Sequence, residues 1–145
     1  MSARKPFDSL QFAKSRENLD GVLRFDELPR LHDSLRPDDG AVQYRISGVS
    51  LRGRPALRVQ VEATIWLTCQ RCMSVYPEML VLDTVLPVAR NDAEMLQWEL
   101  SDPLLDILVA DPLLDVAALV EDEILLSLPT VPLHPDGGCG PDHLA

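Results

Sequence analysis

Three cysteines and one histidine are the residues of this chain best suited to metal chemistry. Cys69 and Cys72 form a Cys-x-x-Cys turn, and Cys139 follows His134 by five residues. A turn of this spacing folds both thiols to the same side, so that they can bind one atom. Three sulfurs and one imidazole suit a structural zinc ion in tetrahedral geometry. A closed set of four ligands leaves no open position for a substrate, so we expect structural rather than catalytic zinc.

Two other interpretations of the cysteines remain open. In the first, they are reduced, half-buried residues that bind no metal, and His134 is an ordinary surface histidine. In the second, Cys69 and Cys72 form a redox pair. The second is disfavoured because thioredoxin-like motifs open a helix within a βαβ unit, whereas this one follows an antiparallel strand. Three is an odd count, which disfavours a disulfide framework and favours a reducing compartment.

Alternating apolar and polar residues predict the strands that position the cysteine turn. The alternation covers residues 41–48 and, without a break, residues 57–68, and residues 76–88 are again rich in β-branched and apolar residues. Short turns join the three segments, so they should form an antiparallel meander with one face buried and one face wet. A further short strand is expected within residues 104–109.

Two helices should pack on this sheet. Residues 25–35 carry leucines at helical spacing, and Asp26 is a plausible N-cap. The segment from Val116 to Leu128 is the clearest helix, because Asp115 can cap it and Pro129 ends it. The sequence therefore predicts a single α+β domain over residues 1–145, with an antiparallel sheet, two main helices and an extended Pro/Gly-rich tail over residues 129–145.

The last helix offers a candidate partner surface. Its residues Val116, Val120, Ile124 and Leu128 form one stripe that should face the sheet. Asp122 lies opposite this stripe, and Leu119 and Leu126 flank it one turn either side. An exposed apolar patch of this kind is typical of a partner surface. The alternative is that the N-terminal helix covers it.

Arginines of the predicted sheet form a second candidate surface. Arg45 and Arg58 fall at polar positions of neighbouring strands, and Arg52 and Arg54 lie in the turn between them. If the strands pair, these residues form a small basic patch that could bind phosphate. Apart from Trp66, the polar positions lack aromatic residues on which bases could stack.

Charge is distributed unevenly along the 145 residues, whose formal net charge is −10. Residues 1–60 contain eleven Lys/Arg and eight Asp/Glu, whereas residues 61–145 contain two and fifteen. The acidic half should repel a nucleic-acid backbone. No apolar run is long enough to span a bilayer, and no secretory signal is recognisable. We find no Gly-rich phosphate loop and no nucleophile with an identifiable base, so an enzyme is the least supported class.

Three pieces of the sequence together resemble the bacterial YceD family, the large-ribosomal-RNA-subunit accumulation proteins. They are the strand ending Cys69-Gln70-Arg71-Cys72, the helix around Glu121-Asp122-Glu123, and the tail with His134 and Cys139. Residues 25–31 also fit the N-terminal half of that family. The resemblance extends from about Phe7 to Cys139.

The resemblance implies a cytoplasmic protein linked to the synthesis, processing or stability of large-subunit (23S) ribosomal RNA. We therefore expect a non-enzymatic factor in ribosome biogenesis that contacts a ribosome-assembly protein or a ribonucleoprotein. One alternative is a direct RNA-binding module that uses Arg45 and Arg58. Another is a zinc-stabilised interaction adaptor unrelated to ribosomal RNA. No membrane and no small-molecule substrate are inferred.

Overall fold

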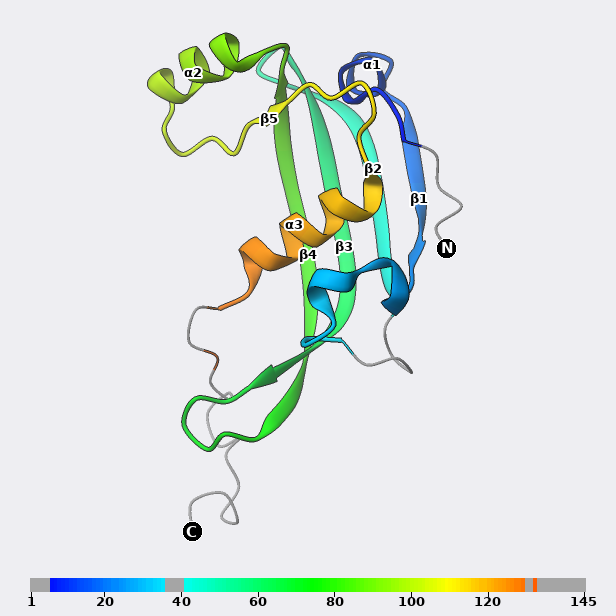
Figure 1. Cartoon of the computed structure of the whole chain (residues 1–145). Helices are drawn as coiled ribbons and strands as arrows, with labels where there is room; N and C mark the ends of the chain where they lie inside the picture. Colours follow the sequence, from blue (N-terminus) through cyan, green and yellow to red (C-terminus); the bar gives the residue numbers. More distant parts are fainter. Residues whose placement is uncertain (1–5, 36–40, 130–131, 133–145) are drawn as a thin grey trace.

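A five-stranded sheet forms the centre of the protein (Figure 1). The computed structural model describes residues 6–35, 41–129 and 132. Within these residues the strands follow in the order β1-β2-β3-β4-β5 across the sheet, antiparallel except for the last pair. The strands are β1 (Asn18–Leu23), β2 (Val42–Leu51), β3 (Arg54–Thr68), β4 (Val75–Ala89) and β5 (Leu108–Val109). The predicted α+β class and the central meander are confirmed.

The alternation in the sequence places every second residue of β3 in the core. Val59, Val61 and Ile65 are almost completely buried, whereas Arg58 and Glu62 point to the other face and are exposed. Side chains alternate across a strand, so one face of the sheet is apolar along its whole length. We call this the covered face, because the helices lie on it.

Helix α3 (Val116–Ser127) crosses the covered face diagonally (Figure 1). The Asp115 side chain accepts hydrogen bonds from the backbone N–H groups of Ala117 and Ala118, as the predicted cap requires. Val120 and Ile124 are completely buried. The predicted helix and its sheet-facing stripe are therefore confirmed.

Helix α1 (Ser9–Lys14) packs on the same face, capped by Asp8. It approaches β2 closely at Gly48, where a Cβ atom would come within 2.5 Å of the carbonyl oxygen of Phe12. Only glycine leaves room for this contact between backbones.

The N-terminal segment departs from its local sequence pattern in two places. Residues 18–21 resemble a turn in sequence, but they belong to β1, whose pairing with β2 overrides the local turn signal. Residues 25–35 contain two short 3-10 helices, η1 (Phe25–Glu27) and η2 (Pro29–Leu31), instead of one α-helix. Leu28, between them, has φ −127° and ψ 63°, which interrupts the helix just before Pro29.

Helix α2 (Asp92–Ser101) lies at the end of the sheet near α1 (Figure 1). None of its residues is buried, and its charged and apolar residues share no clear face, so the sequence did not predict it. The Arg54 guanidinium lies 4.4 Å from the centroid of the Trp98 ring, which connects α2 to β3. Among the described residues, no helix combines the length and apolar character needed to cross a membrane.

Candidate functional site

The cysteine turn connects β3 and β4 at the end of the sheet remote from α1 and α2 (Figure 1). Cys69 is completely buried and Cys72 is half-buried. The Cys69 backbone N–H donates to the Ser74 carbonyl at 2.9 Å, and the Met73 N–H donates to the Cys69 carbonyl at 2.7 Å. Met73 has φ 63°, the left-handed conformation that closes the turn. The backbone N–H of Arg71 lies 3.4 Å from Cys69 Sγ, so the turn directs a donor at the sulfur.

At Pro132 the chain after α3 lies beside this turn. The Gln70 backbone N–H, between the two cysteines, donates to the Pro132 carbonyl oxygen at 2.8 Å. His134 and Cys139, the other two predicted zinc ligands, lie outside the described residues. The described residues alone bring together no group of three or more potential ligands.

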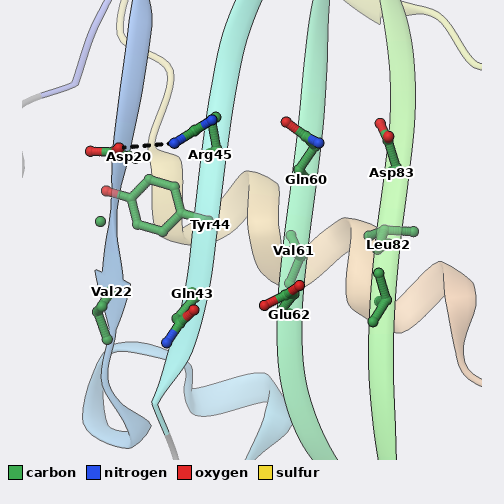
Figure 2. A pocket seen from close by; sticks show the side chains of 12 residues that line it. Asp20, Val22, Gln43, Tyr44, Arg45, Gln60, Val61, Glu62, Leu82 and Asp83 are labelled. Atoms are coloured by element: carbon green, nitrogen blue, oxygen red, sulfur yellow. Dashed lines mark ion pairs between the residues drawn. The ribbon is translucent and has the colours of Figure 1, made fainter.

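The face of the sheet opposite α3 carries a shallow hollow of about 550 Å³ (Figure 2). We call this side the open face. Two rows of side chains cross it from β1 to β4, because the strands are in register. The first row is Asp20, Arg45, Gln60 and Asp83, and the second is Val22, Gln43, Glu62 and Val81.

The arginines of this region are already paired with acids or an aromatic ring. Arg45 forms an ion pair with Asp20 at 3.6 Å, and Arg58 makes two hydrogen bonds to Asp83, at 2.6 and 2.9 Å. The Arg58 hydrogen bonds lower the pKa of Asp83, so this carboxylate stays charged. Arg52 lies 3.9 Å from Asp102, and Arg54 contacts Trp98 as described above.

These pairings change the interpretation of the predicted basic patch. The hollow is lined by three carboxylates, from Asp20, Glu62 and Asp83, against the single guanidinium of Arg45. The sequence pattern placed the arginines on one face but did not identify the acids that neutralise them. Only the strand register, which puts Asp20 beside Arg45 and Arg58 near Asp83, brings them together.

Arg30, in the N-terminal segment, contacts the outer surface of α3. The Arg30 backbone N–H and Nε donate to the Glu121 carboxylate at 2.8 and 3.3 Å, and Arg30 Nη1 lies 2.7 Å from Asp122 Oδ1. Leu119 is only 4% exposed, so its expected place on an outer surface is corrected. The competing expectation, that the N-terminal helix covers this surface, is met only in part: Arg30 of η2 contacts α3 at Ala118, Glu121 and Asp122. Leu126 is 72% exposed and remains accessible.

Glu123 is a residue that the sequence interpretation missed. It is 8% exposed, and the described residues provide no hydrogen bond or ion pair to its carboxylate. Burial, followed by the nearby charges of Asp106 and Asp122, raises the pKa of Glu123 to about 7. The signal in the sequence was its place beside Ile124 in the sheet-facing half of the helix.

Comparison with known proteins agrees with the resemblance seen in the sequence. The sequence model of a family described as "Large ribosomal RNA subunit accumulation protein YceD" matches residues 57–145. A Haemophilus influenzae protein of the same name is 28% identical over 141 residues, which cover 91% of this chain and 76% of the relative. No solved structure matches this chain. The matched region contains the cysteine turn, β4 and α3, and the chain therefore belongs to the YceD family.

Proposed function

We propose that this protein supports the accumulation of large-subunit (23S) ribosomal RNA in the cytoplasm, as a non-enzymatic factor in ribosome biogenesis. The observation that carries the proposal is membership of the YceD family, with a relative that aligns to 91% of this chain and carries that name. The proposed mode of action is contact with a ribosome-assembly protein or a ribonucleoprotein particle.

The charge distribution supports contact with a protein over direct binding of RNA through the arginines. RNA binding depends on cations that release counterions from phosphates. Arg45 and Arg58 already neutralise Asp20 and Asp83, and the hollow between them has more carboxylates than guanidinium groups. A phosphate backbone would have to displace these acids and approach an acidic protein.

The role in ribosomal RNA accumulation is tested in cells that lack the protein. We expect the ratio of 23S to 16S ribosomal RNA to fall, and a plasmid copy of the chain to restore it. An unchanged ratio, with the protein verified as absent, would refute the proposed role.

A structural zinc ion at the cysteine turn is a separate proposal. Its ligands would be Cys69, Cys72, His134 and Cys139, and the donor set fits a closed tetrahedral site. Two contacts support it: the Arg71 N–H directed at Cys69 Sγ orders the turn around that sulfur, and the hydrogen bond from Gln70 to Pro132 brings the start of the tail beside the turn. When bound, zinc would supply stability rather than reaction chemistry.

Metal analysis of freshly purified protein with reduced thiols tests this proposal. We expect about one zinc per chain, because a structural site of this kind binds one ion, and a lower melting temperature for Cys139→Ser. Ser127→Ala, on the exposed end of α3, is the control and should retain the metal. Protein that contains no zinc while its thiols are intact would exclude the site.

A further inference from the structure

In the part of the chain that the structure describes, strand β4 has an edge without a strand partner over most of its length. It pairs with β3 from Val75 to Pro87, but β5 joins its other side only at Val88 and Ala89. Within the described residues, no backbone hydrogen bond reaches the outer side of β4 between residues 77 and 87. An exposed edge presents unpaired N–H and C=O groups that can template a further strand.

The backbone groups that point outward can be identified from their neighbours. The N–H of Trp66, which lies opposite Pro77, donates away from β4 to the Ser34 carbonyl oxygen. The Ala89 carbonyl oxygen accepts from Ala110 on the outer side. Since hydrogen-bonding direction alternates along an antiparallel pair, the odd-numbered residues of β4 direct their N–H and C=O groups outward.

Two prolines delimit this edge. Pro77 and Pro87 occupy outward-directed positions, where proline costs no hydrogen bond to β3. Between them, four residues have outward N–H groups: Met79, Val81, Asp83 and Val85. The free edge is therefore a defined segment, long enough to pair with a short extended peptide.

Apolar groups are exposed beside this edge. Met79 and Val81 are each 67% exposed on the open face. On the covered face, both views show the last turns of α3 extending past β4 on its free side (Figures 1 and 2). Leu125 and Leu126, in those turns, are 37% and 72% exposed. The helix thus overhangs the position that an additional strand would occupy.

The charges around the edge favour one kind of partner. Glu78 adjoins it, and Glu62 lies beside Val81. Residues 61–145 contain two basic and fifteen acidic residues. A second copy of the chain would bring a further charge of −10 and be repelled, whereas a basic polypeptide would be attracted.

We propose that the β4 edge from Met79 to Val85 binds a basic, extended segment of a partner polypeptide, which joins the sheet beside β4. Main-chain hydrogen bonds to the four outward residues supply the affinity, and alternate side chains contact the open face and the overhanging end of α3. This inference rests on the proposed function in one respect, because it describes the partner through which that function is carried out.

Binding of a short synthetic peptide that alternates lysine with valine tests the edge directly. Nuclear magnetic resonance should show that the N–H groups of Met79, Val81, Asp83 and Val85 exchange rapidly in the free protein and become protected with the peptide. A matching peptide that alternates glutamate with valine should not bind. Equal binding of both peptides, or protection elsewhere on the chain, would overturn the proposal.

Two substitutions at Val81 separate backbone pairing from general attraction of charge. Val81→Pro removes one outward N–H, as Pro77 and Pro87 already do, and should weaken binding by at least about tenfold. Val81→Thr keeps the N–H group and the β-branched shape, so it should bind as the wild type does. Melting temperatures confirm that both variants are folded. If Val81→Pro binds normally, or if the edge instead joins two copies of this chain, the proposal is wrong.

Failure of this inference differs from failure of the proposed function. If Val81→Pro restores the 23S ribosomal RNA of cells lacking the protein, the edge is not needed although the role in RNA accumulation stands. If loss of the whole protein leaves the RNA unchanged, the proposed function fails, and peptide binding still decides what the edge does.

Discussion

The two faces of the sheet use the same strands for different purposes. On the covered face, β3 contributes Val59, Val61 and Ile65 to a core closed by α1 and α3. On the open face, Arg58 and Glu62 of the same strand are exposed, and the hollow is lined by polar and paired charged groups. Stability should therefore depend on the covered face, while the open face and its β4 edge can serve contacts without cost to folding.

The largest expected effect comes from truncating the helix at the covered face. Ile124 is completely buried, so Ile124→Ala should lower the free energy of unfolding by about 3–4 kcal/mol through lost burial and a cavity. Leu126→Ala, two residues on but 72% exposed, should change it by less than about 0.5 kcal/mol. Chemical denaturation measures both. Similar losses for the two variants would contradict the assigned orientation of α3.

Glu123, which is buried on α3, should make the stability of the protein depend on pH. Its pKa is raised from the ordinary value of 4.5 to about 7, so its ionisation is harder in the folded than in the unfolded chain. The contribution of Glu123 to the free energy of unfolding is therefore fully present below pH 4.5, and it is lost as the pH rises to about 7. Glu123→Gln removes this dependence and should stabilise the protein at pH 8 by up to about 3 kcal/mol relative to the wild type.

Melting curves of the two proteins at several pH values measure the effect. The difference between Glu123→Gln and the wild type should be small at pH 4 and should grow across the window from 4.5 to 7. A constant difference across this range would show that Glu123 ionises normally.

Two neighbouring acids on α3 provide a smaller contrast. Glu121 is buried and accepts the Arg30 backbone N–H, so Glu121→Ala leaves that donor unsatisfied and should cost about 2 kcal/mol. Asp122 is paired with the same arginine but is exposed, so Asp122→Ala should cost less than about 1 kcal/mol. Denaturation of the two variants in parallel is the test. The reverse order would mean that the N-terminal segment is held mainly by the exposed pair.

The parts of the fold that sequence could predict are those where local pattern and tertiary environment agree. In β3 the alternation runs unbroken because one face is buried throughout, and in α3 the apolar stripe, Asp115 and Pro129 all define the same helix. The predicted meeting of His134 and Cys139 with the cysteine turn stays a prediction, because both residues lie outside the described residues; the hydrogen bond from Gln70 to Pro132 places only the chain before them beside the turn.

Elsewhere, long-range contacts decided the structure against the local pattern. Residues 18–21 are typical of a turn, but β2 pairs with them, and a Cβ atom at Gly21 would come within 2.8 Å of the Tyr44 hydroxyl oxygen. Leu119 was expected at an outer helical position, but it is 4% exposed and belongs to the buried core cluster. The pairing of Arg45 and Arg58 with acids likewise depends on strand register, which no local pattern specifies.

The central claim is that this protein supports 23S ribosomal RNA through contact with a protein and does not need the arginines of the open face to bind RNA. The most direct test replaces the wild-type chain in cells by the double variant Arg45→Gln, Arg58→Gln, with its level and melting temperature verified. We predict a ratio of 23S to 16S ribosomal RNA equal to that of the wild type. A ratio as low as that of cells lacking the protein would contradict the account and favour direct binding of RNA.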